Sequence, residues 1–96
     1  MGLFGRKKSS GQDEGERYYR MYLDSNKQRL EYLEKSAALG NYHGKAGLGY
    51  YYLEHFPDDR EKLQEASRLL KEAKAQGAML DPEKMSLLHM KLGNNK

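Results

Sequence analysis

The stretch of this chain closest to a ligand-binding motif is GNYHGKAGLG at residues 40–49, where four glycines surround Lys45. A phosphate-binding loop has the form G-x-x-x-x-G-K-[ST], in which backbone N–H groups hold the phosphates, lysine reaches them and a hydroxyl binds magnesium. Here the spacing is one residue short, and Ala46 occupies the position that requires a hydroxyl. The stretch also follows a predicted helix, whereas the motif follows a buried strand. We therefore do not expect nucleotide binding.

Histidine and cysteine offer little other chemistry in this sequence. His43, His55 and His89 lack the i, i+4 spacing of a helical metal pair, and no neighbouring acidic cluster completes a site. Cysteine is absent, so thiolate catalysis, disulfides and cysteine-ligated zinc are excluded, and a reducing compartment is compatible. No Ser, His and acid grouping has a local signature, although a spatial one stays open. We expect a protein that is not an enzyme and has no cofactor or metal.

Eight tyrosines and no tryptophan distinguish the composition. Four of them, Tyr18, Tyr22, Tyr32 and Tyr52, lie on the predicted inner stripes of helices. Others fall on the opposite side, where a large, stiff ring with a polar tip suits protein recognition. The predicted partner-binding residues are Tyr50, Tyr51, His43, Glu54 and His55. A partly exposed tyrosine that only covers its own helix is an equally open alternative.

The net charge of +3 belongs to the first few residues. Arg6, Lys7 and Lys8 supply it, while residues 12–96 hold 14 basic and 14 acidic side chains. A neutral body lacks the broad positive field that favours nucleic-acid binding. We predict that residues 1–12 form a flexible basic arm, which is the only part expected to touch nucleic acid or an anionic membrane, at about 1 kcal/mol per charge. No apolar run reaches the roughly 18 residues of a membrane span, so a cytoplasmic location is expected.

The secondary structure that holds these residues is predicted to be helical throughout residues 13–96, because no stretch alternates apolar and polar residues as a strand would. The predicted helices cover about 14–23, a segment ending at Gly40, 42–55, a segment ending at Gln76, and 82–92. Ser25 with Gln28, and Asp58 with Glu61, are predicted to form capping boxes at the starts of the second and fourth helices. Gly40 and Gly77 are predicted to stop helices, and Asp81-Pro82-Glu83 to open the last one.

The glycines after residue 40 therefore require a packing explanation. Each glycine inside a helix costs about 1 kcal/mol relative to alanine, and close approach of a neighbour is the usual compensation. The apolar face of residues 42–55 is too wide for a single neighbour. We predict a helix wedged between two others, with Gly44 and Gly49 allowing them to approach. Lys45 is expected to point partly inward at the helix start and to extend its ammonium to solvent.

An internal repeat supports stacked helical hairpins. YLEKSAALG at 32–40 aligns with LLKEAKAQG at 69–77 without gaps, at an offset of 37 residues. KSAALGN, followed by Gly44, Leu48-Gly49 and Tyr52, resembles the Sel-one-like repeat, a bacterial and eukaryotic relative of the tetratricopeptide repeat. The match covers about residues 25–78, and the flanking helices would cap the stack.

This resemblance implies an all-α fold, a short right-handed α-solenoid of about five antiparallel helices. It also implies a non-catalytic protein-protein interaction or scaffold module whose partner is another protein or peptide. An arm that binds nucleic acid or an anionic membrane is the alternative function. Met85, Leu88, Met90 and Leu92 share a segment that could close one end of the core or pair with a second copy in a homodimer.

Overall fold

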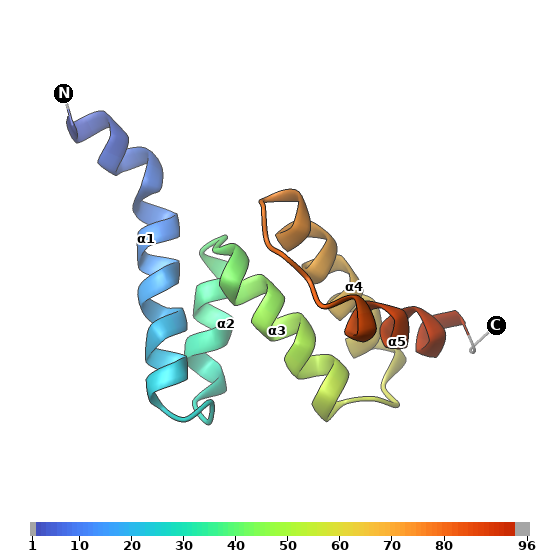
Figure 1. The fold of residues 1–96 in the computed structure, drawn as a ribbon. Helices are drawn as coiled ribbons and strands as arrows, with labels where there is room; N and C mark the ends of the chain where they lie inside the picture. Colours follow the sequence, from blue (N-terminus) through green and yellow to red (C-terminus); the bar gives the residue numbers. More distant parts are fainter. Residues whose placement is uncertain (1, 94–96) are drawn as a thin grey trace.

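Helices are the only regular secondary structure in the part of the chain described by the computed structural model, which covers the backbone of residues 2–93 and the side chains of residues 13–93 (Figure 1). In order these are α1 (Gly2–Asp24), α2 (Leu30–Ala38), α3 (Tyr42–His55), α4 (Arg60–Ala75) and α5 (Pro82–Gly93). The all-α prediction is confirmed, and α3 has the bounds that the sequence predicts. The predicted basic arm, with Arg6, Lys7 and Lys8, lies outside the residues whose side chains are described.

Glycine and aspartate delimit several helices as expected. Gly40 and Gly77 follow α2 and α4 with φ values of +87° and +111°, a left-handed conformation that glycine adopts without a steric penalty. Pro82 is the first residue of α5, and the Asp81 side chain accepts a hydrogen bond from the Glu83 N–H at 2.9 Å. These predicted boundaries are confirmed.

Two predicted caps are wrong. Ser25 does not start α2, because residues 26 and 27 take left-handed φ values of +63° and +60° and interrupt the helix. The Ser25 hydroxyl instead donates to the Tyr22 carbonyl at 2.6 Å and accepts from the Arg29 N–H at 3.1 Å, which closes the turn. At α4 the cap is Asp59, not Asp58. A turn joins the Asp59 N–H to the Phe56 carbonyl, which leaves the Asp59 side chain to accept from the Lys62 N–H at 3.1 Å.

Helix α3 lies at the centre of the packing, between α2 and α4, and α1 contacts both α2 and α3 (Figure 1). A Cβ added at Gly44 would lie 2.2 Å from the Ser36 hydroxyl oxygen of α2, and one at Gly49 would lie 2.8 Å from the Leu70 Cγ of α4. The prediction of a helix wedged between two close neighbours is confirmed. The buried core comprises Tyr22, Leu33, Leu48, Tyr52, Leu53, Leu63, Ala66, Leu69, Leu70 and Leu88.

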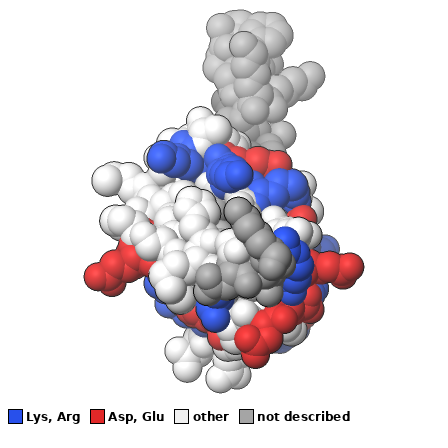
Figure 2. Space-filling view, turned by 90° about the vertical axis from the view of Figure 1, so that its right-hand side faces the viewer, with Lys and Arg blue, Asp and Glu red and all other residues white. Residues whose placement is uncertain are grey.

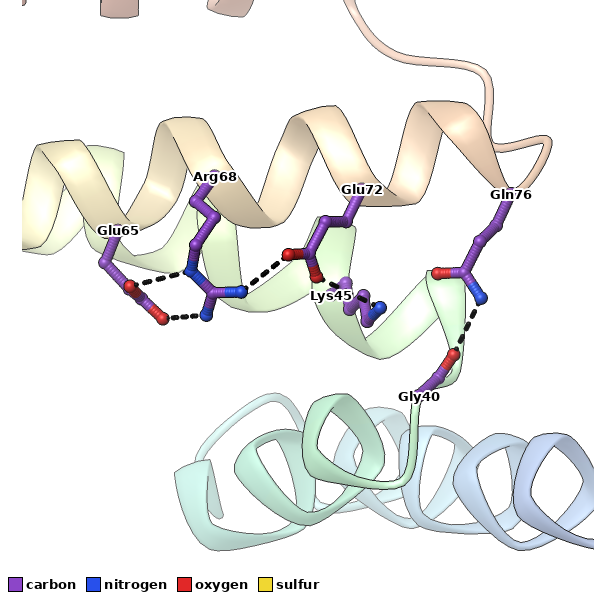
Figure 3. A network of polar contacts seen from close by, with 6 residues as sticks. All are labelled: Gly40, Lys45, Glu65, Arg68, Glu72 and Gln76. Carbon is purple, nitrogen blue, oxygen red and sulfur yellow. Dashed lines mark hydrogen bonds and ion pairs between the residues drawn. The ribbon is translucent and has the colours of Figure 1, made fainter.

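A polar network ties α4 to the start of α3 (Figure 3). Arg68 bridges Glu65 and Glu72 on α4, and the Lys45 ammonium lies 3.1 Å from the second oxygen of Glu72. The Gln76 amide donates to the Gly40 carbonyl at 3.0 Å. Lys45, the residue that a phosphate loop would use, is thus committed to an ion pair between helices.

Helix α5 closes the core at its C-terminal end. Leu88 is fully buried, Met85 and Leu92 pack partly buried against the core, and Leu87 and Met90 remain 43% and 60% exposed. Figure 2 faces this end and shows a continuous area without charged side chains, bordered by basic and acidic ones. The segment therefore serves the first of its two predicted roles, and the homodimer stays a prediction.

Candidate functional site

Two adjoining hollows run along one side of α3. The first has a volume of about 210 Å³ and is lined by Tyr19, Tyr22, Leu23, Lys27, Gly47, Tyr50, Tyr51, Glu54, His55 and Lys84. The second, of about 380 Å³, is lined by Tyr19, Tyr42, His43, Ala46, Gly47, Tyr50, Gly77, Ala78 and Met79. Because Tyr19, Gly47 and Tyr50 line both, the hollows form one depression, which we call the tyrosine groove.

All five predicted partner-binding residues line this groove. Tyr50, Tyr51, Glu54 and His55 lie in the first hollow, and His43 lies in the second. Their spacing along α3 follows the i, i+3, i+4 pattern of a single helix face, which is why sequence periodicity could group them. The structure places these residues along one groove, and their role in binding stays a prediction.

Tyrosine hydroxyls supply polar groups to the first hollow. Only 7% of Tyr22 is exposed, yet its hydroxyl makes no hydrogen bond with a described residue, and no buried side-chain oxygen in that part of the chain lacks a partner. The hydroxyl must therefore reach the solvent of the hollow. Burial, with a smaller contribution from Tyr51, raises the pKa of Tyr22 above its usual 10.0. The phenol thus remains a hydrogen-bond donor at neutral pH.

An ion pair and a hydrogen bond connect the start of α5 to α3 at the edge of the first hollow. The Lys84 ammonium pairs with Glu54, which raises the pKa of Lys84. The same ammonium lies 5.1 Å from the centre of the Tyr50 ring. The Tyr50 hydroxyl accepts a hydrogen bond from the Asp81 N–H at 2.9 Å. These contacts engage one oxygen of the Glu54 carboxylate and one lone pair of the Tyr50 hydroxyl.

Lys27 and His55 complete the first hollow. The His55 ring stacks on Tyr51 with 4.2 Å between ring centres. Lys27 is exposed in the turn after α1 and forms no ion pair with any residue whose side chain is described. The first hollow therefore contains one cation whose charge is not neutralised by a neighbour.

His43 joins α1 to α3 at the second hollow. Its Nδ1 lies 2.8 Å from the Glu16 carboxylate, and the Asn41 amide donates to the same oxygen at 3.3 Å. The hydrogen bond with His43 is the main cause that lowers the pKa of Glu16. The ring also stacks on Tyr19 at 5.4 Å. His43 thus has a structural contact in addition to its predicted place in the groove.

Four polar residues that line the first hollow were not among the predicted partner-binding set: Tyr19, Tyr22, Lys27 and Lys84. The sequence does mark the two tyrosines, because they lie on one stripe of the α1 helix and combine an apolar ring with a polar hydroxyl. Tyr22 was predicted only as a core residue; its ring is buried as predicted, and its hydroxyl also reaches the hollow. No sequence pattern marks Lys27 or Lys84 as a lining residue. The position of Lys27 depends on a left-handed turn, and that of Lys84 depends on how α5 packs.

The described part of the chain shows neither a metal-binding cluster nor a membrane-spanning helix. Its side chains include no group of three or more His, Cys, Asp or Glu residues placed to hold a metal ion. None of its helices has the length and apolar character needed to cross a bilayer. The tyrosine groove is accordingly the feature on which a functional proposal can rest.

Comparison of the chain with protein-family models, with curated proteins and with solved structures gives no match. The resemblance to Sel-one-like repeats thus rests on the quoted residues alone. Function has to be inferred from the groove itself.

Proposed function

We propose that this chain is a non-catalytic protein-protein interaction module of helical-repeat type, and that its tyrosine groove binds a segment of another protein. The observation that carries the proposal is the convergence of Tyr19, Tyr22, Tyr50 and Tyr51 on one continuous groove. Tyrosine is enriched at protein interfaces because its ring supplies a large contact area at small entropic cost and its hydroxyl supplies a hydrogen bond.

A short right-handed solenoid of antiparallel, Sel-one-like hairpins is the architecture that we propose for this module. Support comes from the packing of α1 on both α2 and α3, and of α3 on α4, since a helix of one hairpin that contacts the corresponding helix of the next is expected in a stack. The groove would then be the concave surface, formed by α1, α3 and α5. A cytoplasmic location suits a chain without cysteine.

The polar groups of the groove favour binding over catalysis. Glu54 is the one carboxylate among its lining residues, and Lys84 occupies it. Histidine is the side chain most often used as a general base, but His43 is hydrogen-bonded to Glu16, and His55 stacks on Tyr51 without a hydrogen bond to a described acid that could orient its ring. The groove instead offers aromatic surface and hydrogen-bond donors, which are suited to recognition.

Affinity capture from the native cell with the full chain and two variants tests the proposal. Tyr51→Ala removes the aromatic wall of the first hollow, and Lys71→Ala changes an exposed residue of α4 that does not line the groove. We expect a protein captured by the wild type and by Lys71→Ala to be lost with Tyr51→Ala, while circular dichroism shows that both variants are folded. Equal capture by all three, or no captured protein, would contradict the proposal.

Binding of nucleic acid or an anionic membrane by the basic arm, the alternative function, predicts a different result. If Arg6, Lys7 and Lys8 were responsible for binding, deletion of residues 1–11 would abolish a salt-sensitive interaction with nucleic acid or anionic vesicles. If the groove is responsible, the deletion leaves partner capture intact. The same assay therefore separates the two functions.

A further inference from the structure

The unoccupied polar groups of the first hollow are hydrogen-bond donors. The hydroxyls of Tyr22 and Tyr51 have no described partner, and the Lys27 ammonium and the His55 ring complete the set. The single carboxylate, Glu54, already pairs with Lys84. A ligand group that enters this hollow can therefore accept a hydrogen bond from each of these groups, and the Lys27 ammonium cannot accept one in return. This favours an acceptor-rich group.

The net charge of the first hollow also favours an acceptor-rich, negatively charged ligand group. Its lining residues include Lys27 and Lys84 against Glu54, which gives two positive charges and one negative charge, or +1 when His55 is neutral. Lys84 and Glu54 neutralise each other, so the remaining charge belongs to Lys27. The rest of the described chain is close to balanced, and this local excess is complementary to one negative charge.

A carboxylate fits this hollow better than a phosphate group. Phosphate carries about −1.5 to −2 charges and is typically held by arginines that bind it with two hydrogen bonds. No arginine is among the residues that line either hollow, and one unpaired lysine matches one charge. Tyrosine hydroxyls and a lysine ammonium together form charge-assisted hydrogen bonds with a carboxylate.

The second hollow provides an apolar neighbour for that carboxylate. Ala46, Gly47, Ala78 and Met79 line it, and Met79 is 97% exposed beside it. Its histidine, His43, is already hydrogen-bonded to Glu16. An apolar side chain would cover this surface and remove it from water.

We propose that the tyrosine groove recognises an acidic peptide segment, with the carboxylate of an Asp or Glu side chain in the first hollow and a nearby apolar side chain in the second. This inference rests on the proposed function and adds the chemistry of the partner. It assigns Lys27, which no sequence motif marks, as the residue that determines the preference for acidic ligands.

Selection from a phage-displayed library of random dodecapeptides on the full-length protein tests the inference. We expect the enriched peptides to share an Asp or Glu close to a large apolar residue. A synthetic enriched peptide should bind at least tenfold more weakly when its acid is changed to the amide, as measured by fluorescence anisotropy. Raising the salt concentration should also weaken binding of the acidic peptide.

Charge reversal supplies the decisive comparison. Lys27→Glu should weaken binding of the acidic peptide at least tenfold, whereas Lys71→Glu makes the same charge change on α4 away from the groove and should leave binding within about twofold. If Lys27→Glu disturbs the turn, Lys27→Asn is the substitute, because asparagine tolerates the left-handed φ of +60° at this position. A selection repeated on the charge-reversed protein should no longer enrich acidic peptides.

The outcomes separate this inference from the function on which it rests. Enriched peptides that lack acids, or equal affinities for Lys27→Glu and Lys71→Glu, would overturn the carboxylate site while Tyr51-dependent binding still upheld the interaction module. Enriched peptides that bind Tyr51→Ala as tightly as the wild type, or no enrichment at all, would overturn both.

Discussion

The three glycines inside α3 should differ sharply in their tolerance of a methyl group. Gly44, Gly47 and Gly49 all lie within one helix, so replacement by alanine gives each a propensity gain of up to about 1 kcal/mol. Their surroundings differ. A Cβ at Gly44 would lie 2.7 Å from the backbone nitrogen of Ala37, whereas one at Gly47 would first meet a terminal methyl of Leu33 at 2.9 Å.

Overpacking a well-filled interior costs about 1–3 kcal/mol. Gly44→Ala should lie at the upper end, because a backbone nitrogen cannot rotate away and α2 would have to separate from α3. After the propensity gain, we expect a net loss of about 2 kcal/mol in the free energy of unfolding, or roughly 8–16 °C in Tm. Gly47→Ala should be close to neutral, because the Leu33 methyl can turn aside. Gly49→Ala should fall between, since it meets the Leu70 Cγ at 2.8 Å.

Urea denaturation followed by far-ultraviolet circular dichroism measures these differences, with Gly93→Ala as a control at an open position. A Cβ at Gly93 would meet nothing within 4 Å, so that variant should unfold like the wild type. The reasoning would be refuted if Gly44→Ala were as stable as Gly47→Ala, because the same methyl group would then fit against backbone and against a side-chain end at equal cost.

Three further predictions concern a cap, a pH dependence and the attachment of α5. Asp59→Ala should lower the free energy of unfolding by about 1 kcal/mol through loss of the α4 cap, whereas Asp58→Ala should have little effect, as urea denaturation of the pair would show. The lowered pKa of Glu16 means that its contribution to stability is complete above its ordinary value of 4.5 and is lost as pH falls through the lowered value. Denaturation across this range should therefore show Glu16→Gln less stable than the wild type at neutral pH and equal to it in strong acid. Tyr50→Phe removes the acceptor for the Asp81 N–H and should cost about 0.5–1.5 kcal/mol, with faster hydrogen exchange at that amide.

Sequence reasoning succeeded where the determining interactions are local. The bounds of α3 and the left-handed φ values of Gly40 and Gly77 follow from helix periodicity and from the freedom of glycine, and both are confirmed. It failed at the starts of α2 and α4. At α2 the left-handed turn at residues 26 and 27 separates Ser25 from the helix, and at α4 two acceptor residues competed. Asp58 and Asp59 are adjacent and chemically identical, and the turn from Phe56 selects the second.

The groove shows the same division between local and tertiary information. Residues on one helix, such as Tyr51 and Glu54, could be grouped by their spacing. The turn at Lys27 could not be foreseen, because the sequence around it also fits a capping box that would have continued into a helix. Nor does any pattern place Lys84 against Glu54, since the pair joins α3 to the start of α5 and depends on how the chain returns after α4.

Tyrosine is the residue through which this small chain combines its core with the surface of the tyrosine groove. A chain with 38% hydrophobic residues and no tryptophan has little apolar material to divide between the two. Leucine in place of Tyr22 would fill the core but remove one hydrogen-bond donor from the first hollow, while a polar residue would supply the donor at the expense of the core. Because the ring is buried and the hydroxyl reaches the groove, one side chain meets both needs. The close approach that glycine allows along α3 then brings such side chains from α1 and α3 to a common surface, so the helix packing that stabilises the fold also creates the groove.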